Sequence, residues 1–435
     1  MKAPRSSDAA ALARIVQTVP FRIALALFVL GGHLAAVVIS GKHRFDAPFN
    51  AAPGRPPALL SPNDGAPANG NRLSVARWDS SNYIAIALRG YSQCPDKNLR
   101  GADLRPLLRT CNLTFYPTYP LLGWLASGGG RLPIDFALWG LSLAASAILL
   151  FLWTGPTLVE RFGLWPTYVS FAVFNLFTTG FILVTMQTEP LALVFTLGAF
   201  IALARRHTTL GAALAGAATA MRITALATGL AYAAALIALT IWERPQAVAA
   251  RVRRGAELLL SGWGVLALLG YYWVRFGDPF IYLHAHSQAF KHEASLAALF
   301  PPAAEKVAAS LAHPLHEGVW LAAALLWFGL GHKPALARFA PVERVFLYAL
   351  FFGCVGIAAY GSVGLAFAGM TRYLLLCLPL YFAIAALTAR KPIVLALWLA
   401  LSSWHYWNAD LCEYSGGPGE RTLRKCNQAH WVGRI

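Results

Sequence analysis

Apolar runs of about 20 residues recur along this 435-residue chain, and they constrain its fold more than any other feature. Hydrophobic residues make up 57% of the sequence and charged residues only 13%, whereas soluble domains carry about 25% charged residues. A backbone in lipid must pair its own amide groups, and these runs do not alternate as membrane-barrel strands do. The sequence therefore predicts an all-α, polytopic membrane helical bundle and excludes a soluble enzyme.

About ten or eleven membrane-crossing helices are expected. Arg222 interrupts the long apolar stretch 209–242, which we divide into a short helix followed by a full one. The first run is too long for the apolar part of a signal peptide and lacks a convincing cleavage site. The expected spans are 20–41, 134–154, 163–183, 188–204, 209–221, 223–242, 255–274, 313–332, 341–362, 370–388 and 392–408.

Basic residues indicate the orientation of these spans. Clusters such as Arg205 with Arg206, and Lys333 with Arg338, fall on one side if 209–242 crosses twice, and that side is cytoplasmic. The net charge of +17 is scattered among apolar segments, so we expect membrane lipids as partners and no nucleic acid. Of 19 acidic residues, those expected in the cytoplasm are Asp8, Glu160, Glu243, Glu257 and Glu343. Chemistry that needs carboxylates is then expected on the extracytoplasmic face.

The expected organisation is one integral membrane domain over residues 1–408, with an extracytoplasmic tail over 409–435. Two long outer loops are expected, at 42–133 and 275–312. No internal repeat is visible, which weakens the case for a transporter built from duplicated halves. Nothing in the sequence indicates the oligomeric state.

Four cysteines fall in the regions expected outside the cytoplasm, where disulfides form. Cys94 and Cys111 share the first outer loop, and Cys412 and Cys426 share the tail. We expect each of these pairs to be joined, although four cysteines allow three connectivities.

The stretch from Arg77 to Tyr91 is the most informative part of the first outer loop. It predicts an amphipathic helix at the outer membrane surface. Asp79, just before this helix, either accepts amide hydrogen bonds as its N-cap or takes part in chemistry. The two roles are compatible, because a capping carboxylate keeps a fixed position and stays ionised. The residues expected on one face of the helix are Ser80, Ile84, Ala87, Leu88 and Tyr91.

Two further motifs lie at the outer ends of apolar runs. The run Phe115-Tyr116-Pro117-Thr118-Tyr119-Pro120 has two prolines three positions apart, which predict a rigid aromatic turn or simple membrane-interface anchoring. Thr188-Glu189-Pro190 opens the fourth span. Either Thr188 caps that helix and Glu189 complements its dipole, or Glu189 faces a substrate.

Arg222 and Arg372 each lie where an apolar segment meets the expected outer face. Ionisable groups at membrane depth are costly and usually functional, and the planar guanidinium of arginine binds phosphate with two parallel hydrogen bonds. The alternative is that both side chains reach out to lipid headgroups. In the second outer loop, Asp278 is followed by His284 and His286, but no third ligand is near, so no metal site is expected.

Taken in order, these stretches resemble the GT-C membrane glycosyltransferases, and within them the PIG-V-type mannosyltransferases and their bacterial relatives. Those proteins carry a Trp-Asp motif that continues to Ile-Ala and Gly-Tyr, here Trp78-Asp79 through Ile86-Ala87 to Gly90-Tyr91. An aromatic-proline run follows in the family, here residues 115–122. The resemblance covers about residues 20–390.

Weaker motifs of the family follow in the same order, and this chain departs from the family pattern in three places. Thr118, in the aromatic-proline run, stands where the family usually has leucine, Thr371 stands where it usually has proline, and the residues after Arg222 differ. These departures put the substrate in doubt more than the class of reaction. The later matches are Thr188-Glu189, Arg222, Arg275-Phe276-Gly277-Asp278-Pro279 and Thr371-Arg372-Tyr373-Leu374.

The resemblance implies transfer of a sugar, mannose in the nearest relatives, from a polyprenyl- or dolichyl-phosphate donor to a hydroxyl of a glycolipid acceptor. It implies inversion at the anomeric carbon, with Asp79 as general base and with Arg222 and Arg372 on the donor phosphate. No cofactor or metal is expected, and a bacterial inner membrane is expected rather than the endoplasmic reticulum. The candidate substrate-binding residues are Trp78, Tyr83, Tyr116, Tyr119, Glu189, Asp278, His284 and Tyr373.

Three alternatives remain open at this point: the same chemistry on a protein acceptor, and two other classes of protein. A lipid or solute transporter, or a flippase, would also show many spans and buried arginines, but it needs no carboxylate-bearing outer loop. A non-catalytic subunit of a membrane complex would keep its function when Asp79 is replaced by asparagine.

Overall fold

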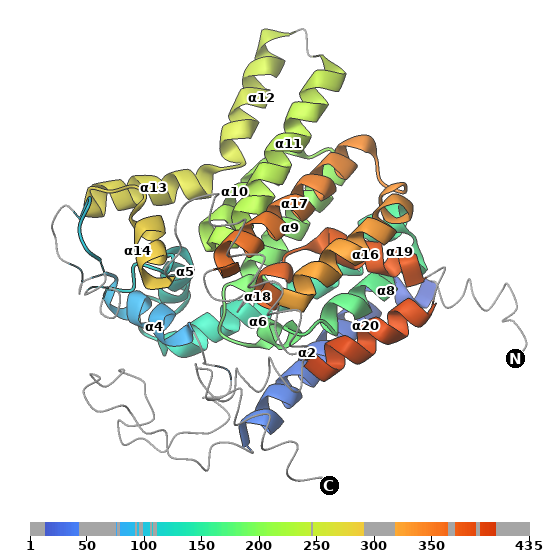
Figure 1. Cartoon of the computed structure of the whole chain (residues 1–435), viewed down its shortest axis with the longest axis horizontal. Helices are drawn as coiled ribbons and strands as arrows, with labels where there is room; N and C mark the ends of the chain where they lie inside the picture. Colours follow the sequence, from blue (N-terminus) through green and yellow to red (C-terminus); the bar gives the residue numbers. More distant parts are fainter. Residues whose placement is uncertain are drawn as a thin grey trace, which may run out of the picture.

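The computed structural model describes residues 14–42, 75, 79–91, 94, 99–104, 107, 111–244, 247–290, 318–363, 370–388 and 392–405. Within these residues every regular element is a helix, and no β-strand is present (Figure 1). The all-α fold class expected from the sequence is therefore confirmed.

Four helices in the described part are long and apolar enough to cross a membrane. Several large apolar side chains on these helices point outward: Phe28 is 79% exposed and Leu230 is 65% exposed. Such surfaces are costly in water and suit contact with lipid. The four spans are Val19–Val38 in α2 (Val19–Lys42), α6 (Ile134–Trp153), Ile223–Glu243 in η2 (Ile223–Ala225) with α11 (Leu226–Glu243), and Pro341–Ala359 in α17 (Pro341–Val363).

Three of the expected spans are interrupted or shortened. The run 163–183 is helical only to Asn175, the run 255–274 breaks at 261–262, and the run 370–388 breaks at 375–377. Hydropathy measures composition, so it does not detect the turns that end these helices. The resulting elements are α8 (Leu164–Asn175) with η1 (Gly180–Val184), α12 (Val248–Leu260) with α13 (Trp263–Phe276), and α18 (Met370–Leu374) with α19 (Leu378–Thr388). The axes of α12 and α13 differ by 59°, and the two together form a fifth candidate span.

The apolar stretch 209–242 folds as a hairpin of two helices, as the sequence predicted. The first helix, α10 (Thr208–Met221), ends at Arg222, whose extended backbone (φ −166°, ψ 158°) breaks the helix. The hydroxyl of Tyr232 in α11 donates to the carbonyl of Thr208, 2.9 Å away, so the second helix returns alongside the first. Arg222 therefore lies at the tip of the hairpin.

Helix α9 (Glu189–Ala204) connects two chemically different ends of the bundle. It has 16 residues and is about 24 Å long at 1.5 Å per residue. Beyond its carboxyl end Arg205 pairs with Glu160 (2.9 Å), and nearby Arg161 pairs with Glu343 (3.3 Å). These residues join α9 to the ends of α7 (Pro156–Phe162) and α17, which the sequence placed together on the cytoplasmic side. Glu189 occupies the opposite end of α9.

Described parts of the loops expected at 42–133 and 275–312 meet, together with α13, in a second small core. Its helices are α4 (Ser80–Arg89), α13 and α14 (Ile281–Phe290). The Leu99 amide donates to the Phe276 carbonyl (2.9 Å), and the Leu104 amide donates to Oε1 of Gln288 (2.7 Å). These bonds fasten the loop before α5 (Thr118–Ala126) to α13 and α14. The remaining described helices are α16 (Gly318–Leu336) and α20 (Pro392–His405).

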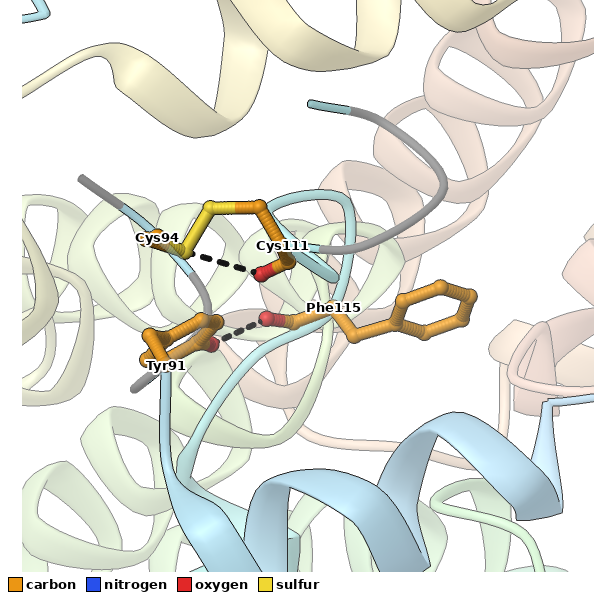
Figure 2. The surroundings of a disulfide bond; sticks show 4 residues. All are labelled: Tyr91, Cys94, Cys111 and Phe115. Carbon is orange, nitrogen blue, oxygen red and sulfur yellow. Dashed lines mark hydrogen bonds between the residues drawn. A yellow bond between two sulfur atoms is a disulfide. The ribbon is translucent and has the colours of Figure 1, made fainter. Parts of the chain in front are cut away.

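A disulfide joins Cys94 to Cys111 in this core, which is the pairing expected for the first outer loop (Figure 2). Beside it, the hydroxyl of Tyr91 donates to the carbonyl of Phe115 (Figure 2). The disulfide and this hydrogen bond hold the end of α4 against the segment that leads into α5. Cys412 and Cys426, and the pairing expected for them, lie outside the described residues.

A helix follows Asp79 as expected, with one change to its buried face. Ser80, Ile84, Ala87 and Tyr91 are buried as expected, but Leu88 is 49% exposed. The two prolines after Tyr116 also differ from expectation. They do not form an isolated turn but begin α5, because proline in a first helical turn loses no hydrogen bond.

Gly216 in α10 packs closely against the junction of α12 and α13, so a larger side chain at this position should destabilise the protein. A Cβ atom at Gly216 would lie 2.4 Å from the Leu260 carbonyl oxygen, whereas a Cβ at Gly140 in α6 meets nothing within 4 Å. We expect Gly216→Ala to lower the free energy of unfolding by about 1–3 kcal/mol through overpacking. Gly140→Ala should leave it unchanged or slightly higher. Thermal unfolding in detergent measures both, and equal midpoints would contradict this packing.

Candidate functional site

Asp79 begins α4, but its side chain does not cap the helix. Its backbone carbonyl accepts hydrogen bonds from the amides of Asn82 (3.0 Å) and Tyr83 (3.1 Å), and the side chain forms no capping bond. Instead Oδ2 accepts a hydrogen bond from Nη1 of Arg372, 2.6 Å away. The local expectation of an N-cap is wrong, because a charged guanidinium is a stronger partner for a carboxylate than a neutral amide.

Arg372, in α18, uses all three of its nitrogens to hold protein oxygens. Besides Asp79, its Nη2 donates to Oε1 of Gln187 (2.7 Å), and its Nε donates to Oε1 of Glu189. Residues 79 and 372 are 293 positions apart, so this arginine joins distant parts of the chain.

Arg222 completes the cluster. Its Nη1 forms an ion pair with the same oxygen of Glu189, and its guanidinium lies 5.8 Å from the centre of the Tyr373 ring. The buried Nε of Arg222 has no hydrogen-bond partner within the described part of the chain. We call Asp79, Glu189, Arg222 and Arg372 the charged quartet. Its two carboxylates and two guanidiniums sum to zero charge.

Hydrogen bonds to the segment before α9 fix the start of α4 beside the arginines. The Ser80 hydroxyl donates to the Met186 carbonyl (2.9 Å), and the Met186 amide donates to the Val75 carbonyl (2.9 Å). The amide nitrogen of Gln187 also reaches the Ser80 hydroxyl at 3.4 Å. Asp79 is therefore held next to the same segment that supplies Gln187 and Glu189.

Glu189 holds the two arginines from the protein interior and does not line the site. Its side chain is fully buried beneath the two arginines, so the expected direct contact with substrate is not supported. The capping role expected of Thr188 is also wrong, because its hydroxyl makes no capping bond and lies 3.4 Å from Oε2 of Glu189. Asp79, in contrast, has a side chain that is 28% exposed and is the accessible carboxylate of the quartet.

Aromatic side chains border the quartet on the side of α4 and α5. Tyr83 packs edge-on against Phe115 (5.7 Å between centroids) and Tyr119 (5.2 Å), and Tyr116 packs edge-on against Tyr282 (4.7 Å). Burial raises the pKa of both Tyr83 and Tyr116, and nearby Asp79 raises that of Tyr83 further. The phenols therefore stay neutral at physiological pH.

Tyr119 proves to be a packing residue. It is fully buried, and its hydroxyl donates to the Leu138 carbonyl (2.8 Å) and lies 2.8 Å from the Ser142 hydroxyl. These bonds fasten α5 to α6. We therefore assign Tyr119 to the interior and remove it from the expected substrate-binding residues.

Asp278 and His284 form a pair apart from the quartet. Oδ1 of Asp278 accepts the Phe280 amide (2.9 Å) at the start of α14, and Oδ2 lies 2.7 Å from Nδ1 of His284. The His284 side chain is exposed, whereas Tyr282, two positions earlier, is buried against Tyr116. Residues two apart lie on nearly opposite faces of a helix, so His284 points away from the side that Tyr282 packs on. The described residues contain no cluster of three metal-ligating side chains.

An apolar cavity of about 550 Å³ lies at the end of α4 opposite to Asp79. Ile86 and Ala87 line it from α4, and Ala220, two positions before Arg222, lines it from α10. Its walls offer almost no polar surface, which suits a hydrocarbon chain. Residues that line it include Ile86, Ala87, Leu121, Trp124, Ala220, Ala267 and Leu268.

Two residues near the quartet were not chosen from the sequence. Gln187 binds Arg372, and the buried ring of Tyr282 lies close enough to Arg222 and Tyr373 to interact electrostatically. Gln187 has a usable sequence signal, because it is a polar residue at the same end of an apolar run as Glu189. Tyr282 has none that distinguishes it from its neighbours. Trp78 lies outside the described residues.

Comparisons with protein-family models, with curated proteins and with solved structures found no match. Function is therefore inferred from the charged quartet and from the apolar cavity. Together they offer a partly exposed carboxylate, two arginines and a place for a hydrocarbon chain. That combination fits an amphiphilic substrate with an anionic head.

The position of Glu189 between two arginines predicts a large loss of stability when its charge is removed. Glu189→Gln leaves two buried guanidiniums with Asp79 as the one remaining carboxylate of the quartet, and we expect a loss of about 3–5 kcal/mol in the free energy of unfolding. Glu160→Gln removes an exposed pair with Arg205 and should cost at most about 1 kcal/mol. Chemical unfolding in detergent compares the two variants. Equal losses would show that the quartet does not depend on Glu189.

Proposed function

We propose that the protein is a membrane glycosyltransferase that moves a sugar from a polyprenyl- or dolichyl-phosphate donor to a hydroxyl of a lipid-linked acceptor. Mannose is the sugar that the sequence resemblance favours. The observation that carries the proposal is Asp79, a partly exposed carboxylate held by Arg372 in a cluster whose Arg222 follows two positions after Ala220, a wall residue of the apolar cavity. The ten- or eleven-span topology, with this site on the extracytoplasmic face of a bacterial inner membrane, belongs to the same proposal.

The proposed step is an inverting displacement at the anomeric carbon. The acceptor hydroxyl gives its proton to the carboxylate of Asp79, and its oxygen attacks the anomeric carbon. The bond from that carbon to the phosphate oxygen breaks, and its electron pair stays on the phosphate. General-base help of this kind contributes about 10²–10⁴-fold to a rate.

The two arginines suit the leaving phosphate. Charge grows on the phosphate as the bond breaks, and preorganised guanidiniums stabilise developing charge most strongly in a site that excludes water. Within the residues that the structure describes, the buried Nε of Arg222 has no hydrogen-bond partner, so it can donate to a phosphate oxygen. Because arginines neutralise a single phosphate in this proposal, no step in it uses a metal ion.

The apolar cavity suits the hydrocarbon chain of the lipid-linked substrate. Burying such a chain releases roughly 25 cal/mol for each Å² of apolar surface removed from water. A site that joins apolar walls to two arginines selects an amphiphile over a water-soluble sugar nucleotide. This combination also favours an enzyme over a non-catalytic subunit, which needs neither feature.

Asp79→Asn should abolish transfer while leaving the protein folded. Asparagine keeps the shape of the side chain but cannot accept the proton, so we expect the rate to fall by about 10²–10⁴-fold. The assay uses purified protein in lipid, radiolabelled polyprenyl-phosphate mannose and a membrane lipid extract.

Asp135→Asn provides the matched control. Asp135 lies in the first turn of α6, where its carboxylate accepts a local hydrogen bond from the Phe136 amide (3.0 Å). This variant should transfer at the wild-type rate. Wild-type activity retained by Asp79→Asn would remove Asp79 as the base.

Ala267→Trp tests the cavity separately from the chemistry. Ala267 lines the cavity from the exposed side of α13, so a tryptophan there fills it without disturbing the core. We expect KM to rise about 10-fold for a long-chain donor and to change little for a short-chain analogue, because one or two lost apolar contacts cost about 1–3 kcal/mol. Val274→Trp, at a 90% exposed site outside the cavity, is the control. An equal change for both chain lengths would place the chain elsewhere.

A further inference from the structure

Asp79 is the accessible partner of Arg372. Glu189 and Gln187, the other two partners, are fully buried, whereas the Asp79 side chain is 28% exposed. An anion that enters the site therefore meets Asp79 and the Nη1 side of Arg372 together. Arg372 already holds the carboxylates of Asp79 and Glu189, so a phosphate would add a third negative group and would compete with Asp79 for the Nη1 side.

We propose that Arg372 exchanges partners during the reaction, leaving Asp79 and taking the donor phosphate. This inference rests on the proposed function and concerns the order of events at the same site. Asp79 is then more than a base: its charge also weakens the binding of phosphate until the proton transfer removes that charge.

The charges in the proposed step favour the exchange. Before transfer, Asp79 and the donor phosphodiester each carry one negative charge. The acceptor proton neutralises Asp79, and the breaking bond adds one negative charge to the phosphate. The stronger partner of Arg372 therefore changes from the carboxylate to the phosphate in the same step. Arg372 couples removal of the proton to departure of the lipid phosphate.

The rest of the quartet keeps its place during the exchange. Glu189 is fully buried and holds both Arg222 and Arg372, so it fixes the two guanidiniums while Asp79 leaves. Gln187, hydrogen-bonded to Arg372 and close to Ser80, is also fully buried. Only the accessible member of the cluster needs to move.

The exchange and a fixed structural pair predict opposite changes in phosphate affinity when the charge of Asp79 is removed. If Asp79 only holds Arg372 in place, then removing its charge loosens the arginine and weakens phosphate binding or leaves it unchanged. If Asp79 competes with phosphate, then removing its charge makes phosphate bind more tightly. Couplings between two ligands of one site typically amount to about 5–150-fold in affinity.

The experiment measures the affinity of the full-length protein in lipid nanodiscs for farnesyl phosphate, a short isoprenoid monophosphate, by isothermal titration. We expect Asp79→Asn to bind it at least about fivefold more tightly than wild type does. Asp135→Asn, which removes one charge elsewhere, should match wild type. Equal or weaker binding by Asp79→Asn would overturn the exchange.

Two further measurements keep the test decisive. In an Arg372→Gln background, Asp79→Asn should no longer change the affinity, because the competed group is gone. A gain that persists there would overturn the role of Arg372. Thermal unfolding checks that each variant is folded, and Asp79→Ser replaces Asp79→Asn if the latter is not.

The outcome separates this inference from the proposed function. Sugar transfer by wild type with no gain in affinity in Asp79→Asn would keep the glycosyltransferase and reject the exchange. A gain in affinity without transfer of any sugar would keep the competition at Arg372 and reject the glycosyltransferase. Saturable binding to neither protein would reject the phosphate site and, with it, both proposals.

Discussion

The buried carboxylate of Glu189 is the interaction on which the rest of the site depends. A lone charge in a dry interior is very costly, and so is an unpaired guanidinium, so Glu189, Arg222 and Arg372 must be brought together or not buried at all. That requirement draws together the start of α9, the tip of the α10–α11 hairpin and helix α18. Asp79 then balances the second arginine from the start of α4. The two carboxylates differ in exposure, and this difference separates a supporting role from a chemical one.

The fold places the quartet at one end of α9. Helix α9 has Glu189 at this end and Arg205 just beyond the other, where Arg205 pairs with Glu160. The segment that the Cys94–Cys111 disulfide closes packs with α13 and α14 in a small core. The apolar cavity lies between α4, α5, α10 and α13, and its wall residue Ala220 is two positions before Arg222. A charged head and an apolar tail could thus bind side by side.

Local patterns in the sequence predicted what depends on local physics. The helices, including the one after Asp79, follow from the pattern of apolar residues. The break at Arg222 follows from a charge within an apolar run. The first disulfide follows from the extracytoplasmic position expected of its loop. The breaks at 261–262 and 375–377 were missed because hydropathy contains no information on turns. The capping role of Asp79 was wrong because a partner 293 positions away outweighs a neighbouring amide, and no local pattern shows that partner. The hydroxyl of Thr188 lies by the carboxylate of Glu189 and makes no capping bond. The sequence pointed to Arg222, Arg372 and Asp79 one by one. That both arginines bind Glu189, and that Asp79 binds Arg372, is seen only in the structure.

The most direct test of this account is a structure of the protein determined by cryo-electron microscopy in lipid, with a polyprenyl phosphate bound. The account predicts phosphate density between Arg222 and Arg372, the hydrocarbon chain in the cavity lined by Ala220 and Ala267, and Asp79 no longer paired with Arg372. Glu189 should still hold both arginines. Phosphate bound at another place, with Asp79 and Arg372 still paired as they are without it, would contradict the account.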